Sequence, residues 1–175
     1  MTHVLLPFRA PVLAGLLFCA SAVCGSAGDG TQSDPVPAQA RQNQDGLTCF
    51  NRALYDLAPK GRKAEAEEQF KLAEDAFKKA LEADRNDLAA HRNLARLYEL
   101  RKEYRQAATE FAEVIRLDPK DIDAYAHMAL VLVELGDTEE AVRTLETAKA
   151  QTDDKRVIQQ LDTYIARAKE VGRTQ

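Results

Sequence analysis

The sequence repeats with a period of 34 residues, and this period restricts the fold more than any other feature. Residues 88–121 align with residues 122–155 without a gap, and small or apolar residues recur where two packed helices need them. The aligned pairs are Ala90 with Ala124, Leu94 with Met128, Ala95 with Ala129, Ala107 with Ala141, Phe111 with Leu145, and Asp87 with Asp121. Such a period, combined with helical hydrophobic spacing, is typical of stacked helix pairs. We therefore predict an all-α fold built as a helix–turn–helix solenoid.

Two further segments extend this array at its ends. Residues 47–87 predict a divergent first helix pair, with helices over 47–58 and 62–83 that a Pro-Lys-Gly break separates. Residues 156–175 predict a helix with one apolar and one polar face. A solenoid needs such an element to cover its last apolar face, so we expect a cap. The alternative is a half-repeat that a partner chain continues.

The first 25 residues have the pattern of a secretory signal peptide. One basic residue, Arg9, precedes the apolar run over residues 10–24, and small residues follow it. The run is shorter than the roughly 18 residues expected of a membrane-spanning helix. We expect export and cleavage, with the candidate sites after Ala22, Gly25 and Ala27. Two alternatives stay open, namely lipidation at Cys24, as in bacterial lipoproteins, and an uncleaved signal anchor.

Residues 26–46 are rich in Gly, Ser, Pro, Gln and Asp and contain almost no large apolar side chain. This composition cannot bury enough surface to offset the entropy of an ordered chain, so we predict a disordered linker. The linker serves either as a tether that extends the reach of the folded part or as a spacer that exposes the cleavage site.

Cys49 follows the predicted linker and stands beside apolar residues at helical spacing. This setting favours a small, buried apolar residue. An odd cysteine in an exported protein has two other uses, a reactive thiol or a disulfide with another chain.

The composition argues against catalysis and against nucleic-acid binding. A net charge of −4 and an isoelectric point near 5.5 leave no basic surface for a polyanion. From Leu47 onward there is no serine, and no Gly-rich phosphate loop occurs. Neither His91 nor His127 has a second ligand at zinc spacing, and we interpret His91 as a packed core residue. We therefore predict no enzyme activity, no cofactor and no metal.

The central segment carries a recognisable repeat motif. Its matching positions are Leu94, Tyr98, Ala107, Phe111 and Pro119, with Ala95 in a Gly place and His91 in a Trp place. With this pattern, residues 88–121 resemble a tetratricopeptide repeat (TPR), and residues 122–155 follow the same scheme more loosely. The whole chain resembles an exported, bacterial-type TPR protein. This resemblance implies that the first helix of each pair lines a groove that binds a partner peptide or helix.

Carried over position by position, the resemblance places seven residues on that groove. These predicted partner-binding residues are Arg92, Arg96, Glu99, Asp123, Ala126, Leu130 and Val133. Leu130 and Val133 are apolar where the surface is expected to be wet, which marks a partner site. The alternative is that the terminal helix covers both.

The resemblance also raises a second kind of recognition, because some TPR domains clamp a terminal carboxylate with basic and amide side chains. Arg92, Asn93 and Arg96 resemble part of such a clamp. Asp123 and His127 stand where the next repeat would need basic or amide groups, so the clamp is the weaker interpretation.

These features imply a non-catalytic protein–protein interaction adaptor of the cell envelope, periplasmic or secreted, whose partner is a protein or peptide. The alternative function is a membrane-tethered envelope-assembly factor that a lipid on Cys24 holds, with residues 26–46 as the tether. The chain would then meet a membrane only through this lipid or through an uncleaved signal.

Overall fold

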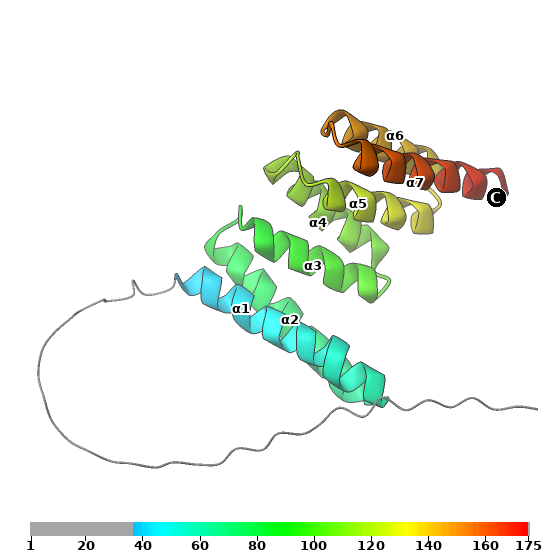
Figure 1. Cartoon of the computed structure of the whole chain (residues 1–175). Coiled ribbons are helices and arrows are strands. Elements are labelled where there is room, and N and C mark those ends of the chain that lie inside the picture. The colour runs from blue at the N-terminus through cyan, green and yellow to red at the C-terminus, as the bar shows by residue number, and fades with distance from the viewer. Residues whose placement is uncertain (1–36, 175) are drawn as a thin grey trace, which may run out of the picture. The chain divides into compact units, whose positions relative to one another are not determined.

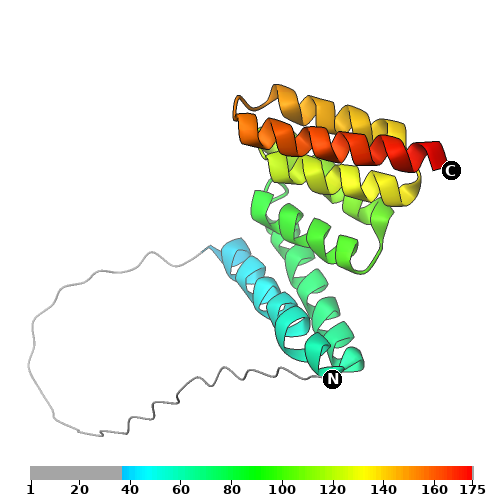
Figure 2. The ribbon, with the colours of Figure 1, turned by 45° about the vertical axis from the view of Figure 1, so that its right-hand side comes forward.

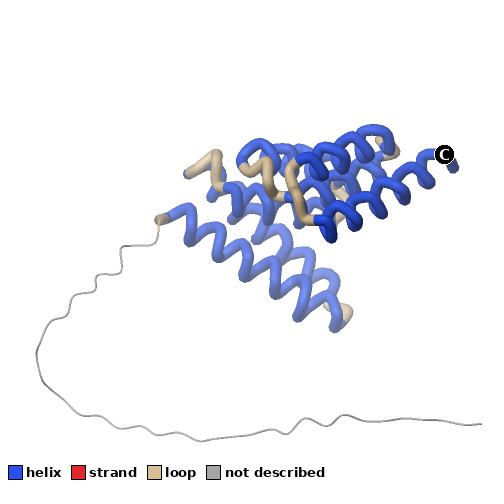
Figure 3. The backbone as a smooth tube through the Cα atoms, turned by 45° about the horizontal axis from the view of Figure 1, so that its top comes forward, coloured by secondary structure: helices blue, strands red, loops and turns tan. Residues whose placement is uncertain are grey.

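The computed structural model describes residues 37–174, so the predicted signal peptide, Cys24 and the linker up to residue 36 lie outside the described part. Within that part the chain is helical, with short turns and no strand (Figure 3). Among the described helices, none has the length and apolarity that crossing a membrane requires. The elements are α1 (Ala38–Asn51), η1 (Arg52–Leu57), η2 (Ala58–Lys60), α2 (Lys63–Ala83), α3 (Leu88–Leu100), α4 (Tyr104–Leu117), α5 (Ile122–Leu135), α6 (Thr138–Ala150) and α7 (Lys155–Thr174).

The helices pack as antiparallel pairs that stack in chain order. α1 packs on α2, α3 on α4 and α5 on α6, and each pair contacts the next (Figures 1 and 2). The first helices of successive units also meet, because α1 contacts α3 and α5 contacts α7. This arrangement confirms the predicted all-α helix–turn–helix solenoid.

The first pair begins earlier than the composition of the chain suggested. α1 starts at Ala38, so residues 38–46, which we assigned to the linker, are helical. Gly46 is the reason why this stretch packs, since it is buried and lies close to the ring of Phe77 on α2. Side chains are otherwise mostly polar there, so the hydrophobic pattern did not reveal the helix. The predicted boundary at Leu47 is therefore corrected.

After Asn51 the same helix continues as the π-helical η1 and a final 3₁₀ turn, η2, and Gly61 (φ 72°) ends it. Leu57 of η1 and Phe70 of α2 belong to a separate apolar cluster that joins these two segments. The front half of α2 thus rests against the first helix.

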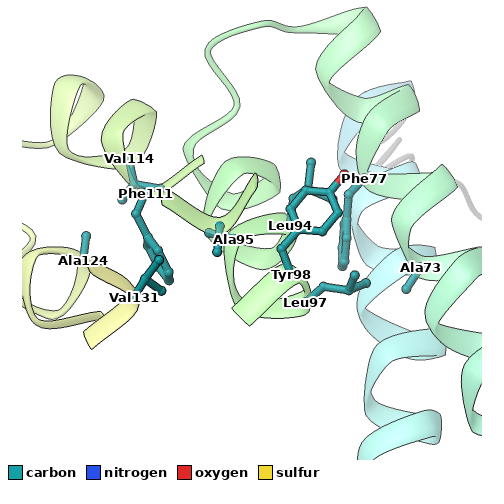
Figure 4. Packing of buried hydrophobic residues seen from close by; sticks show 11 residues of the cluster. Ala73, Phe77, Leu94, Ala95, Leu97, Tyr98, Phe111, Val114, Ala124 and Val131 are labelled. Atoms are coloured by element: carbon teal, nitrogen blue, oxygen red, sulfur yellow. The ribbon is translucent and has the colours of Figure 1, made fainter. Parts of the chain in front are cut away.

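The main core runs without a gap from the first pair into the third. Figure 4 shows Phe77 of α2 facing Leu94 and Tyr98 of α3, while Phe111 of α4 lies near Val131 of α5. Ala95 is fully buried at the close approach between helices. Small residues there let two helices come together, which explains why Ala replaces Gly at this place in the repeat.

Two turns inside the repeats each place a residue at a positive φ. Lys102 has φ 61° between α3 and α4, and Gly136, 34 residues later, has φ 88° between α5 and α6. A positive φ costs little for Gly but strains any residue with a Cβ atom. Lys102 is therefore the strained member of an equivalent pair.

The repeated aspartates cap the first helix of each repeat. Asp87 Oδ1 accepts a hydrogen bond from the amide of Ala90 (3.0 Å), and Asp121 Oδ1 accepts one from Ala124 (3.1 Å). These bonds satisfy amides that would otherwise lack a partner in the first turn. Asp137, which precedes α6, makes no side-chain capping hydrogen bond.

The terminal helix α7 covers the last apolar face, as predicted. Leu161, Ile165 and Ala168 are buried against the α5–α6 pair. Its outward side carries exposed polar residues, among them Arg156, Thr163 and Glu170. A polar outer face is what an array end requires for solubility.

Candidate functional site: a divided groove along α3, α5 and α7

The surface formed by the first helices of the repeats is hollowed in two places. The larger hollow lies between α5 and α7 and has a volume of about 640 Å³. The smaller one, of about 290 Å³, lies between α3 and α5. Asp123 and His127 line both, so the two hollows adjoin, and together we call them the groove, with an α5/α7 section and an α3/α5 section.

The α5/α7 section is mainly apolar. Of the predicted partner-binding residues it contains Asp123, Ala126, Leu130 and Val133, all from α5. The Leu130 side chain is 49% exposed, whereas Val133 is half-buried against the core. α7 therefore does not cover Leu130, and it covers Val133 only in part.

The opposite wall of this section comes from α7 and was missed in the sequence. Val157, Tyr164 and Val171 line the hollow, seven residues apart, together with the polar Gln160 and Arg167. From the sequence we predict only a capping role for α7. A second apolar stripe on this helix, displaced from the buried residues that form the cap, is the sequence feature that indicates this wall.

The α3/α5 section is lined by charged residues. Arg92 and Arg96 enter it from α3, and Asp121 and Asp123 enter it from the start of α5. Arg92 donates from Nε (3.1 Å) and Nη2 (2.5 Å) to Oδ2 of Asp121, whose side chain is only 10% exposed. The two arginines and two aspartates of the α3/α5 section therefore balance in charge, whereas an anion-binding site would carry a net positive charge.

The carboxylate clamp is not assembled in this structure. Arg92 is paired with Asp121, and Asn93 donates from Nδ2 to Oδ1 of Asn43 on α1 (2.9 Å). Both of these side chains are thus used within the molecule. Within residues 37–174, the guanidinium of Arg96 has no such partner, and it is exposed.

Glu99 is less available than the sequence suggested. Its carboxylate lies 2.9 Å from Nδ1 of His127, and only 19% of its side chain is exposed. The ring of His127 stacks on Phe111, with centroids 5.5 Å apart and an interplanar angle of 8°. Glu99 therefore holds the ring of His127, which lines both hollows, and Glu99 itself lines neither of them.

The second histidine supports the fold. His91 is only 8% exposed, and its Nδ1 lies 2.7 Å from Oε2 of Glu110 while Nε2 lies 3.0 Å from the carbonyl oxygen of Arg85. It is the packed core residue that we predicted. Among the described residues, no group of three His, Cys, Asp or Glu side chains is arranged to hold a metal.

Cys49 lies on α1, half-buried, and packs against the main core cluster. This placement fits a packing role. It lies away from both hollows, since neither is lined by a residue of α1.

Residues 100–162 match a family model described as tetratricopeptide repeat. Similar solved structures include the TPR2B domain of yeast Sti1 in a pHsp70 complex, with TM-score 0.59 and 15% identity over 75% of this chain and 96% of that one. The second TPR domain of human RPAP3, in complex with the HSP70 peptide SGPTIEEVD, has TM-score 0.55 and 19% identity over 75% and 98%. The first TPR of Spaghetti (RPAP3), bound to the HSP90 peptide SRMEEVD, has TM-score 0.51 and 20% identity over 73% and 95%. No curated protein matches the sequence.

Proposed function

We propose that this chain, which has the tetratricopeptide repeat fold and matches that family's model over residues 100–162, is a non-catalytic adaptor that binds a partner protein or peptide in its groove. The observation that carries the proposal is Leu130, a large apolar side chain that is 49% exposed inside a hollow of about 640 Å³. Apolar side chains gathered in a concave site gain stability when a partner removes them from water.

Rigid support of the groove favours this role. The α5 wall is anchored by the capping bond of Asp121, and the α7 wall by the burial of Leu161 and Ile165. A site that is formed in advance loses little entropy when it binds, so more of the interaction energy remains as affinity.

The peptides bound to the similar structures support a protein or peptide partner of this chain. The peptides in the two RPAP3 complexes both end in the residues EEVD. We do not extend that terminal recognition to this chain, because Arg92 and Asn93 already have partners within the molecule.

We further propose that the protein acts in the cell envelope after export, on the strength of the signal pattern in residues 1–25. The alternative is a membrane-tethered assembly factor with lipid on Cys24. Mass spectrometry of the mature amino terminus distinguishes the two. A free α-amine after Ala22, Gly25 or Ala27 excludes the lipoprotein, whereas a diacylglyceryl mass on Cys24 establishes it.

The adaptor role is tested with two variants of matched exposure. Leu130→Asp places a charge in the α5/α7 section, and Leu72→Asp does the same on α2, where the leucine is 48% exposed and lines neither hollow. Proximity labelling in the source cell identifies the neighbours of each variant. We expect Leu130→Asp to lose proteins that the wild type and Leu72→Asp both label. Identical labelling by all three proteins contradicts a groove-bound partner.

A further inference from the structure

The walls of the α5/α7 section carry apolar side chains at helical spacing along their whole length. On α5 these are Ala126, Leu130 and Val133, and on α7 they are Val157, Tyr164 and Val171. From Val157 to Val171 the α7 stripe covers 15 residues, and its 14 helical steps of about 1.5 Å give a length of about 21 Å. The hollow is therefore a long trough with two apolar walls, and not a pocket for a single side chain.

An extended peptide fits this trough poorly, because its backbone amides and carbonyls need polar partners when they are buried. Apart from the charged Asp123, Glu134 and Arg167, the polar side chains that line the trough already have partners. His127 pairs with Glu99, and Gln160 donates to the hydroxyl of Tyr164 (2.8 Å). A helix satisfies its own backbone and brings only side chains to the walls.

The charges at the rim give the occupant an orientation about its axis. On the α5 side the exposed carboxylates of Asp123 and Glu134 line the trough, and on the α7 side the exposed guanidinium of Arg167 does. Glu134 also accepts a hydrogen bond from the hydroxyl of Tyr104, and this neutral donor does not cancel the negative charge of Glu134. Opposite charges on the flanks of a bound helix would face these groups favourably.

Building on the proposed adaptor function, we propose that the α5/α7 section binds an internal amphipathic helix of a partner protein. The helix is about 14 residues long, with apolar residues at positions i, i+3, i+4, i+7 and i+11 that pack between α5 and α7. Its basic flank lies along α5 and its acidic flank along α7. Because the Arg92 and Asn93 side chains are used internally, binding needs no free terminal carboxylate.

The test uses synthetic peptides of about 14 residues and one composition, titrated calorimetrically into the full chain. One peptide has leucines at helical spacing with lysines on one flank and glutamates on the other. A second has the same residues with leucines at every other position. Both are made with an amidated carboxyl end, and the helical one also with a free carboxylate.

We expect the helical peptide to bind at least about tenfold more tightly than the alternating one, and amidation to change its affinity less than about threefold. Leu130→Asp should weaken its binding by at least about tenfold, and Leu72→Asp should leave it unchanged. Equal or tighter binding of the alternating peptide overturns the proposal. So does a gain of about tenfold from the free carboxylate, or the absence of binding by the helical peptide at about 1 mM.

This outcome is separable from that of the adaptor function. If Leu130→Asp removes neighbours in the labelling experiment while the helical peptide fails to bind, the groove binds a partner but the partner is not a helix of this kind. If labelling is identical for every variant, the adaptor function itself is wrong.

Discussion

Asp121 uses both of its carboxylate oxygens to join two successive repeats. Oδ1 accepts from the amide of Ala124 and caps α5, while Oδ2 accepts from Nε and Nη2 of Arg92 on α3. One side chain therefore fixes where the second repeat begins and how it sits against the first. The same contact partly neutralises the charge of Arg92, which weakens its attraction for an external anion.

We expect Asp121→Ala to lower the free energy of unfolding by about 1–3 kcal/mol, because both the cap and the ion pair are lost. Arg92→Ala should cost less than about 1 kcal/mol, since 40% of its side chain is exposed and water screens the pair. Urea denaturation of the two single variants and the double variant measures both effects. An Arg92→Ala cost equal to that of Asp121→Ala would show that the ion pair, not the cap, is the larger contribution.

Arg96→Glu tests whether the α3/α5 section takes part in partner binding. Its guanidinium is exposed in the groove, so the charge reversal should weaken capture of the labelled partner and leave helix content and melting temperature unchanged. Arg105→Glu, on the exposed side of α4, is the matched control. If Arg96→Glu captures the partner as well as the wild type does, the α3/α5 section does not take part in partner binding.

The 34-residue period predicted the packing well because it reflects contacts that every repeat must make. Asp87 and Asp121 recur as caps, and Ala95 recurs as Ala129 where helices approach closely. Spacing along one helix also predicted which face of α7 is buried. Such features depend on residues near in sequence, so the sequence displays them.

The missed features depend on contacts between distant segments. Nothing near Asn93 in the sequence indicates that its side-chain amide donates a hydrogen bond to Asn43, 50 residues earlier. Likewise the pairing of Glu99 with His127 is visible only once α3 and α5 lie side by side. The helical turns before Leu47 lack an apolar stripe. Gly46 packs there because it has no side chain, which lets α1 approach Phe77 of α2 closely.

Lys102→Gly should stabilise the protein by about 0.5–1 kcal/mol. At φ 61°, Lys102 holds a backbone conformation that its Cβ atom disfavours and that Gly136 adopts in the equivalent turn. The gain is reduced because the unfolded chain is more flexible with Gly than with Lys at this position, so folding costs more backbone entropy. Thermal melting measures the change. The reciprocal variant Gly136→Ala should destabilise the protein, and stabilisation by that variant would contradict the argument.

Gly46→Ala should destabilise the protein although Ala favours helices by about 1 kcal/mol over Gly. A Cβ atom at this position would lie 2.6 Å from Cε1 of Phe77 and 3.2 Å from the carbonyl oxygen of Ala73. Phe77 is fully buried and cannot move aside, so overpacking costs about 1–3 kcal/mol. Urea denaturation of Gly46→Ala measures the balance, and a net gain in stability would mean that α1 shifts freely on α2.

Glu74 on α2 joins the first helix pair to the central repeat. Its Oε1 accepts from the hydroxyl of Tyr98 (3.1 Å) and from Nζ of Lys78 (2.6 Å), and its Oε2 accepts from Nη1 of Arg101 (2.7 Å). Burial raises the pKa of Glu74, but the hydrogen bonds from Lys78 and Tyr98 and the charge of Arg101 outweigh it. The pKa is therefore held below its ordinary value of 4.5.

The lowered pKa of Glu74 makes stability depend on pH in acid. As pH falls below about 4.5, the unfolded chain binds a proton at this carboxyl before the folded protein does, so unfolding becomes easier. The contribution is complete above the ordinary pKa and is lost as pH falls through the folded pKa. Glu74→Gln should lower the free energy of unfolding at pH 7 by about 1–3 kcal/mol and flatten its acid dependence, whereas Glu68→Gln, at an exposed position of α2, should do neither. Urea denaturation between pH 3 and pH 7 measures both, and an acid dependence that Glu74→Gln leaves unchanged would show that other carboxylates account for it.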